Sequence, residues 1–312
     1  MILYTVIPCY NEEEVLPQTA KVLSNKYRAL IEAGLISGES RILFVDDGSK
    51  DGTWEMISAF HQSDPMFCGI KLSRNRGHQN ALLAGLITAA KRCDAAVSID
   101  ADLQDDVDAI DKMVLKFNEG CDIVYGVRDK RDSDRFMKRF TAEGYYRIMQ
   151  FFGANIIFNH ADFRLMSRRA LEALVQFDEV NLFLRGMVPM LGFKSDIVYY
   201  ERRPRLAGES KYTVKKMLDL AWNGITSFST KPIDMIVFGG VFVSAAALFS
   251  MLVFLILLIF GISVGGTGWI LASLFLCCGI NLLAVGTVGE YVGKTYVEAK
   301  HRPKYIIEEI LE

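Results

Sequence analysis

The chain has 312 residues, which is enough for one large domain or two domains of ordinary size. It carries 35 lysine and arginine residues against 37 acidic residues, and the resulting net charge of −2 argues against nucleic acid as a partner. The six cysteines show neither a Cys-x-x-Cys pair nor the spacing of a zinc site, so we expect buried, reduced thiols in a cytosolic environment.

Strand-like and helix-like patterns alternate along the first part of the chain. The strands are expected at 2–7, 41–45, 67–72, 95–99 and 122–126, and the helices at 12–33, 51–60, 77–91 and 105–119. Strands that are apolar on both faces and alternate with helices are typical of an α/β fold with a mainly parallel sheet covered on both sides. Ligands bind such sheets at the carboxyl ends of the strands, where this chain carries its polar motifs.

A highly charged segment follows at 130–139. Two interpretations of it are open, a solvated loop and a mobile loop beside an anionic substrate. Beyond this segment, helical patterns are expected at 140–152, 167–175 and 182–191, and a strand at 196–200.

Residues 211–228 have the pattern of an amphipathic helix. Lys211, Lys215 and Lys216 stand at its start, and the apolar residues that follow, Trp222 among them, fall on one face. We interpret the segment as a helix lying in the membrane interface, because basic residues favour anionic headgroups and tryptophan favours the boundary. The alternative is an ordinary amphipathic helix packed on the preceding domain.

Two long apolar stretches, 233–261 and 269–292, close the chain. Each is longer than the roughly 20 residues that a membrane-spanning helix needs. Lysines flank the pair on both sides, and the positive-inside rule then places both flanks in the cytosol. We therefore expect a multi-pass protein of the plasma or inner membrane, with the catalytic domain and both termini cytosolic and no secretory signal peptide.

These patterns divide the chain into four parts. We expect a cytosolic catalytic domain over 1–210, an amphipathic interface helix over 211–231, a two-helix transmembrane hairpin over 232–292 and a cytosolic tail over 293–312. Small residues in the apolar stretches allow close helix packing, so a homo-oligomer is a further expectation.

A pair of carboxylates, Asp100 and Asp102, comes directly after the predicted strand at 95–99. Two acids at a strand end are suited to hold a hard divalent cation, Mg²⁺ or Mn²⁺, against the negative charges of a nucleotide diphosphate. The other interpretation is a pair of residues that caps the helix beginning at Asp105. The Asp-x-Asp pattern is weak by itself and becomes more specific through its place in an α/β domain.

Further motifs strengthen the nucleotide interpretation. They end the first three predicted strands and read Val6-Ile7-Pro8-Cys9-Tyr10-Asn11-Glu12, Val45-Asp46-Asp47-Gly48-Ser49 and Ser73-Arg74-Asn75-Arg76-Gly77-His78-Gln79-Asn80-Ala81. The arginines beside a glycine-started helix suit an anion. With the segments 161–166, 205–212 and 289–293, this set resembles the inverting family 2 glycosyltransferases with the GT-A fold. Within that family it is similar to the polyprenyl-phosphate glycosyltransferases, the subgroup of the bactoprenol glucosyltransferases and of dolichyl-phosphate mannose synthase, which also includes tetramers.

The resemblance implies a role for each motif residue. It implies nucleotide-sugar binding for Pro8, Tyr10, Glu12, Asp47, Arg74, Gly77, His78, Asp100 and Gln104. It implies catalytic roles for Asp162, Asp102 and Arg164, and metal binding for Asp100 and Asp102. It implies contact with the acceptor phosphate for Arg205, Ser210 and Lys211.

Asp162 occupies the position that is usually called the catalytic base. The acceptor would be a phosphate monoester with a second pKa near 6, so it is mostly deprotonated at neutral pH. General-base help matters most where a proton must leave a weak acid. We therefore hypothesise that Asp162 orients the sugar or stabilises positive charge that develops at the anomeric carbon.

The resulting prediction is a metal-dependent transferase that moves a hexose, with UDP-glucose as the expected donor, onto a polyprenyl phosphate with inversion at C1. Another UDP- or GDP-sugar (galactose, mannose, N-acetylglucosamine or an aminoarabinose type) remains an alternative donor. A processive polysaccharide synthase would need a Gln-x-x-Arg-Trp segment, which is absent. A nucleotidyltransferase would need a Gly-rich phosphate-binding loop near the start of the chain, and the first motif is not such a loop. A catalytically inactive membrane scaffold that binds nucleotide sugar is disfavoured because the acidic motif residues are intact.

Overall fold

The computed structural model of the chain describes residues 1–129, 160–177, 182–201 and 266–312, together with isolated positions between 179 and 260. The chain divides into two units. The first comprises Met1–Tyr146, Asn155–Val214 and Arg302–Glu312, and the second comprises Arg147–Ala154 and Lys215–His301. The predicted helix at 140–152 and the predicted interface helix at 211–228 lie outside the described residues.

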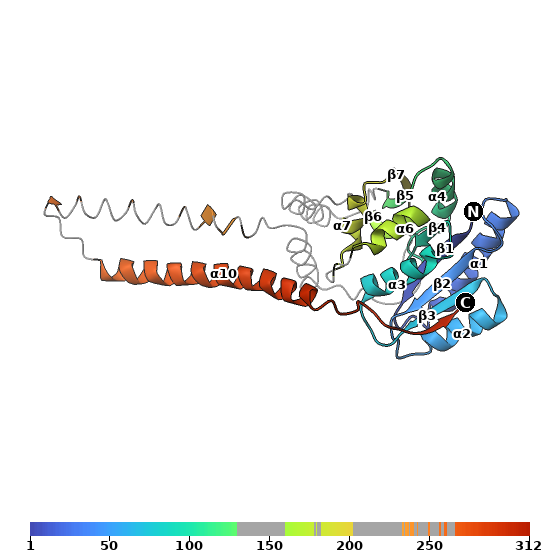
Figure 1. The fold of residues 1–312 in the computed structure, drawn as a ribbon, viewed down its shortest axis with the longest axis horizontal. Helices are drawn as coiled ribbons and strands as arrows, with labels where there is room; N and C mark the ends of the chain where they lie inside the picture. The colour runs from blue at the N-terminus through green and yellow to red at the C-terminus, as the bar shows by residue number, and fades with distance from the viewer. Residues whose placement is uncertain are drawn as a thin grey trace. The chain divides into compact units, whose positions relative to one another are not determined.

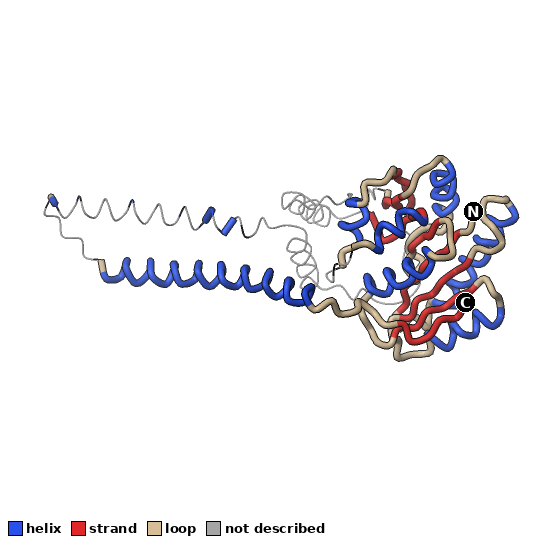
Figure 2. Tube along the Cα trace, in the orientation of Figure 1, coloured by secondary structure: helices blue, strands red, loops and turns tan. Residues whose placement is uncertain are grey.

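A mixed sheet forms the centre of the first unit (Figure 2). Its described strands are β1 (Leu3–Cys9), β2 (Arg41–Asp46), β3 (Phe67–Leu72), β4 (Ala95–Ser98), β5 (Ile123–Arg128), β6 (His160–Ser167), β7 (Ser195–Tyr200) and β8 (Ile307–Leu311). They lie in the order β7-β5-β6-β4-β1-β2-β3-β8. The central strands β4, β1, β2 and β3 are parallel, as is the β5–β7 pair. β6 runs antiparallel to β4 and β5, and β8 runs antiparallel to β3.

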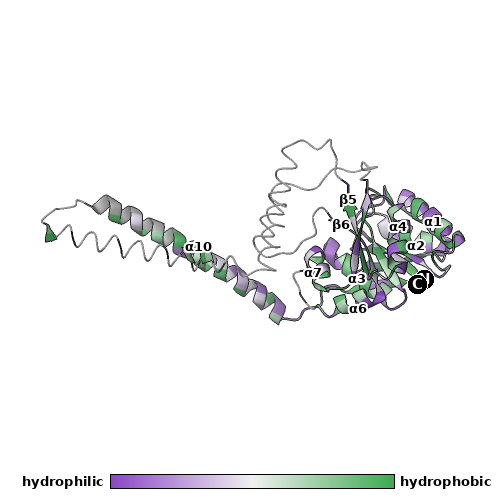
Figure 3. Ribbon diagram, turned by 90° about the horizontal axis from the view of Figure 1, so that it is seen from above, coloured by the Kyte–Doolittle hydropathy of each residue, from purple (hydrophilic) through white to green (hydrophobic). Residues whose placement is uncertain are grey.

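Helices cover both faces of this sheet. The described helices of the first unit are α1 (Leu16–Glu32), α2 (Thr53–Ser63), α3 (His78–Ala90), α4 (Ala109–Asn118), α6 (Arg168–Val175) and α7 (Leu184–Met190). Figure 3 shows α1, α2 and α4 on one side of the sheet and α3, α6 and α7 on the other. Buried side chains of α1 and α4, such as Leu23 and Ile110, join one core cluster with sheet residues such as Phe44 and Val97. The predicted α/β fold with a mainly parallel sheet covered on both sides is confirmed.

The last residues of the chain complete one edge of the sheet. Strand β8 pairs with β3, with Ile310 opposite Ile70. The Lys71–Glu308 ion pair, at 3.0 Å, connects these two strands further, and Glu312 also pairs with Arg92, which follows α3. Residues 293–312, expected from the sequence as a tail, therefore contribute a strand to the central sheet, while the proposed four-part division of the chain stays a prediction.

The second unit contains one long described helix, α10 (Thr267–Ala299), drawn in orange and red in Figure 1. Most of the predicted first span, 233–261, lies outside the described residues. Within the part that the structure does describe, no helix combines the length and the sustained apolar character that crossing a membrane requires. The prediction of a multi-pass membrane location is therefore wrong by this finding, and the predicted two-helix transmembrane hairpin is not confirmed. Within α10 the predicted second span, 269–292, contains Glu290 and is followed by the charged residues Lys294 and Glu298, and Figure 3 shows this hydrophilic end.

Candidate active site

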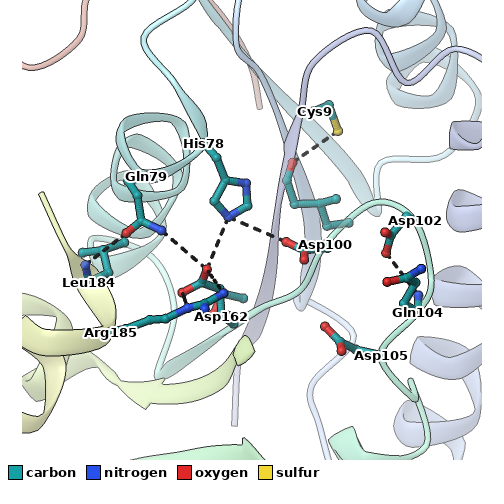
Figure 4. A network of polar contacts seen from close by, with 12 residues as sticks. Cys9, His78, Gln79, Asp100, Asp102, Gln104, Asp105, Asp162, Leu184 and Arg185 are labelled. Carbon is teal, nitrogen blue, oxygen red and sulfur yellow. Dashed lines mark hydrogen bonds and ion pairs between the residues drawn. The ribbon is translucent and has the colours of Figure 1, made fainter. Parts of the chain in front are cut away.

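The polar motifs lie together at the edge of the sheet that is formed by the carboxyl ends of its parallel strands, as the strand directions predict. Asp47 follows β2 and Asp100 follows β4, two strands that run parallel to β1. Asp162 lies near the start of β6, which is antiparallel to β4 and pairs Arg164 with Ser98. Because of this direction, the start of β6 reaches the same edge as the end of β4. Figure 4 shows Asp162 and Asp100 in one polar network there.

Asp162 is the centre of that network and is only 6% exposed. Nη2 of Arg164 donates to Oδ1 of Asp162 at 2.6 Å. Arg185 donates through Nε to the same oxygen at 3.2 Å and through Nη2 to Oδ2 at 3.0 Å. Gln79 donates to Oδ2 at 3.5 Å, and Nε2 of His78 lies 3.7 Å from that oxygen. One carboxylate therefore holds two guanidinium groups and faces an imidazole.

The charges around Asp162 keep it ionised. Burial by itself raises the pKa of this carboxyl, but the facing Arg185, His78 and Arg164 outweigh burial and hold the pKa well below its usual range. Arg164 is 1% exposed, and its Nη1 donates to the carbonyl of Leu184 at 3.2 Å. Because a carboxylate with such a low pKa is a weak proton acceptor, the geometry gives little support to a base role for Asp162.

His78 connects Asp162 with Asp100. Its Nε2 lies 3.7 Å from Oδ1 of Asp100 and at the same distance from Oδ2 of Asp162. Burial lowers the pKa of His78, but the hydrogen bond to Asp162 and the charge of Asp100 raise it above its ordinary value overall. The two acids therefore favour the protonated form of the imidazole.

Asp100 lies where negative charge is already concentrated. Its pKa is raised to about 6, chiefly because protein atoms displace water around it; the charge of His78 opposes this shift, and the negative charges of Asp105, Asp162 and Asp102 add to it. A bound cation would relieve this repulsion.

The donor atoms at this edge fit a hard divalent cation. Asp100 and Asp102 offer carboxylate oxygens two residues apart. In the described part of the chain, no group of three or more His, Cys, Asp or Glu side chains forms a metal cluster. Mg²⁺ is commonly held by one or two carboxylates together with substrate phosphates and water, so two carboxylates suffice when a diphosphate supplies the remaining ligands.

A buried ion pair supports the loop that carries Asp102 and Gln104. Asp105 is buried and accepts from the Tyr200 hydroxyl at 2.5 Å and from Nη2 of Arg128 at 3.3 Å. Within the loop, the backbone N–H of Gln104 donates to Oδ1 of Asp102 at 3.2 Å. The ends of β5 and β7 therefore hold the carboxylate loop in place.

Asp47 lies beneath the loop at 73–77. It is buried, its Oδ1 accepts from the backbone N–H of Arg76 at 2.7 Å, and its Oδ2 accepts from that of Gly77 at 2.8 Å. Burial is the main reason that the pKa of Asp47 is raised, and these two hydrogen bonds oppose it. Asp47 thus fixes the start of α3, and with it His78. Its predicted contact with the nucleoside stays a prediction.

The first two motif loops are bound to each other. The backbone N–H of Asn11 donates to Oγ of Ser49 at 2.9 Å, and Oδ1 of Asn11 accepts from the backbone N–H of Lys50 at 2.8 Å. The backbone N–H of Glu12 donates to Oγ1 of Thr53 at 3.0 Å. The structure thus brings the predicted donor-binding residues of these loops to the same edge of the sheet; they are Pro8, Tyr10, Glu12 and Asp47. Arg74 is exposed on the loop that Asp47 supports.

Three predicted residues lie outside the described part of the chain, namely Arg205, Ser210 and Lys211. In the other direction, the structure adds Arg185 and Gln79, which the motif analysis did not select. Arg185 is the one charged residue in the apolar stretch 182–191, and an isolated arginine in an apolar helical pattern is the signal that pointed to it.

Comparison with known proteins gives one family for this chain. The family described as "Glycosyl transferase family 2" matches residues 4–175. "Uncharacterized glycosyltransferase YkoT" of Bacillus subtilis is 49% identical over 310 residues, which are 98% of this chain and 91% of that protein. "Prophage bactoprenol glucosyl transferase homolog" of Escherichia coli is 39% identical over 312 residues, 99% of each chain. "Bactoprenol glucosyl transferase" of Shigella phage SfV is 39% identical over 309 residues, 98% of each chain.

Proposed function

The chain belongs to glycosyl transferase family 2, and from this premise we propose that it transfers glucose from UDP-glucose to the phosphate of a polyprenyl phosphate such as undecaprenyl phosphate. Two relatives that align over nearly the whole chain carry names that state bactoprenol glucosyl transfer. Their full-length similarity supports the same acceptor class and the same sugar for this chain.

One observation carries the proposal. A carboxylate pair suited to a cation and a cluster of positive side chains lie at the same edge of the sheet, joined by His78, whose Nε2 is 3.7 Å from both Asp100 and Asp162. Transfer between two phosphate-bearing substrates needs both kinds of charge. The acids would hold a cation against the donor diphosphate, and the positive side chains would favour a second phosphate.

The bond changes are those of an in-line displacement. An oxygen of the acceptor phosphate forms a bond to C1 of the sugar, the bond from C1 to the donor diphosphate breaks, and UDP leaves with the electron pair. Attack from the side opposite the leaving group inverts C1, so an α-linked donor gives a β-linked product. The phosphate nucleophile is already ionised near neutral pH, so no residue has to accept its proton.

The protein groups orient the two substrates. In this proposal Asp100 and Asp102 hold Mg²⁺ or Mn²⁺, and the cation, when bound, neutralises the diphosphate and improves it as a leaving group. Gln104 and the two loops bound through Asn11 face the nucleotide. Asp162 acts through the guanidinium groups that it holds, since its low pKa makes it a poor base.

The direct test uses the purified full-length chain in detergent micelles. We expect radiolabel from UDP-glucose to enter the organic phase only when a polyprenyl phosphate is present. GDP-mannose, UDP-galactose and UDP-N-acetylglucosamine serve as alternative donors, and transfer from one of these instead would reassign the donor. UDP release that does not depend on the lipid phosphate would reject the acceptor.

A further inference from the structure

We propose that Arg185 binds the phosphate group of the acceptor and that Asp162 is the residue that positions it. This inference rests on the function proposed above and deepens it, because it assigns the acceptor to a particular side chain of the described site.

The charge balance around Asp162 is the first argument. Two guanidinium groups, those of Arg164 and Arg185, share its single carboxylate, so the three side chains together carry one net positive charge. Arg164 is 1% exposed and also donates to the carbonyl of Leu184, so it neutralises Asp162 within the core. Arg185 is 37% exposed. Of the two guanidinium groups on Asp162, the one that a ligand can reach is therefore that of Arg185.

The second argument is that Arg185 is held in one orientation. Asp162 receives both Nε and Nη2 of Arg185, which fixes the plane of the guanidinium. The preceding residue is also fixed, because the N–H of Leu184 donates to Oε1 of Gln79 at 3.0 Å and its carbonyl accepts from Arg164. A preorganised, planar, multidentate cation is well suited to a phosphate and loses little freedom on binding it.

The third argument is position. Figure 4 shows Arg185 and Asp100 on opposite sides of Asp162. The acids on the Asp100 side repel a phosphate unless a cation covers them, which suits the donor diphosphate. A second phosphate is favoured on the Arg185 side, where a partly exposed guanidinium faces the site. An uncharged acceptor, such as an alcohol, would gain no ionic interaction from a fixed cation at this position.

The experiment measures steady-state transfer with UDP-glucose and undecaprenyl phosphate in micelles for wild type, Arg185→Gln, Arg185→Lys and a matched surface control, Arg169→Gln. Arg169 is 67% exposed and pairs with Asp122 on another part of the surface. We expect Arg185→Gln to raise the acceptor KM at least tenfold while the donor KM changes less than twofold. Arg185→Lys keeps the charge but loses the planar contact, so we expect an intermediate acceptor KM, and Arg169→Gln should behave as wild type.

A competition arm separates charge recognition from recognition of the lipid chain. Farnesyl phosphate should inhibit wild type, farnesol should not, and Arg185→Gln should lose most of the inhibition by farnesyl phosphate. Inorganic phosphate should compete weakly, and again only where Arg185 is present. If the Gln variant does not fold, as judged by its thermal midpoint, Arg185→Lys is measured in both arms, and an acceptor KM and a farnesyl phosphate inhibition equal to those of wild type would overturn the inference.

The outcomes distinguish this inference from the proposed function. Lipid-linked product from wild type with an unchanged acceptor KM in Arg185→Gln overturns the role of Arg185 and leaves the function standing. A rise in donor KM alone would assign Arg185 to the donor and would also overturn the inference. Absence of lipid-linked product from wild type with any phosphate acceptor rejects the function and the inference together.

Discussion

At the scale of single residues, Asp162 and its partners decide what chemistry the site can perform. A carboxylate that receives Arg164 at 2.6 Å and two bonds from Arg185 is an anchor for positive groups more than a proton acceptor. The sequence showed that Asp162 and Arg164 belong to one motif. The part played by Arg185 depends on an ion pair between positions far apart in the chain, which residue patterns do not encode.

The low pKa of Asp162 predicts a stability change with a defined pH window. Its pKa in the folded state is lower than in the unfolded chain, so its contribution to the free energy of unfolding is complete above about pH 4 and is lost as the pH falls through the folded-state pKa. We expect Asp162→Asn to lower the free energy of unfolding by about 3 kcal/mol at pH 7, since Arg164 loses its buried counter-ion. The difference from wild type should shrink below pH 4.

Urea denaturation of both proteins between pH 3 and pH 7 measures this effect. Asp108→Asn is the control, because Asp108 is 69% exposed and its partner Lys26 keeps a second ion pair with Asp111, so the substitution should cost less than about 1 kcal/mol. Equal stability of Asp162→Asn and wild type at pH 7 would show that the buried ion pairs do not stabilise the fold.

At the scale of elements, the alternating pattern predicted the central strands and helices closely. The strand expected at 41–45 is β2 (Arg41–Asp46), and the helix expected at 77–91 is α3 (His78–Ala90). Two strands were not predicted. β6 carries polar residues such as Asp162 and Arg164, which hide its strand pattern, and β8 follows a long helix and pairs with β3 across more than two hundred residues. Such non-local pairings are set by tertiary packing, which local propensity does not show.

The turn after β2 packs against the loop that leads to His78. A side chain at one glycine of this turn would disrupt the packing. Gly48 has φ +67°, and a Cβ there would lie 2.7 Å from the backbone of Arg74 and Asn75. We expect Gly48→Ala to cost about 3 kcal/mol from left-handed strain and overlap together, and to raise the donor KM because the 73–77 loop must move. Gly34→Ala is the matched control, since Gly34 has φ +70° with open space around it, and it should cost about 1 kcal/mol. Equal costs for the two variants would show that the loop contact is unimportant.

Two neighbouring tyrosines at the end of β7 test the support of the carboxylate loop. Tyr200 is buried and donates to Asp105, whereas Tyr199 is exposed. We expect Tyr200→Phe to lower the free energy of unfolding by about 2 kcal/mol and to raise the donor KM several-fold, because Asp105 loses a partner next to the loop of Asp102. Tyr199→Phe should change neither quantity. A normal donor KM in Tyr200→Phe would separate Asp105 from donor binding.

At the scale of the whole molecule, the fold class and the family were predicted correctly from the sequence, whereas the predicted multi-pass membrane location was wrong. Apolar composition over 269–292 predicted a spanning helix, but composition does not show that the folded helix continues to Ala299 through charged residues. The catalytic edge was predictable because strand direction in a parallel sheet follows from the alternating pattern. The contacts of a single side chain such as Gln79 were not predictable, because they depend on how α3 and α7 pack.

The central claim is that acids at the sheet edge use a divalent cation to assist glucose transfer to a lipid phosphate. The most direct measurement is radiolabel from UDP-glucose recovered in organic solvent, with undecaprenyl phosphate present, for wild type and Asp102→Asn, after EDTA treatment and after addition of Mn²⁺ or Mg²⁺. We predict that chelation removes wild-type product, that the added metal restores it, and that Asp102→Asn stays at least a hundredfold below wild type at every metal concentration. Equal product before and after chelation, or no product from wild type with any lipid phosphate, would contradict the account.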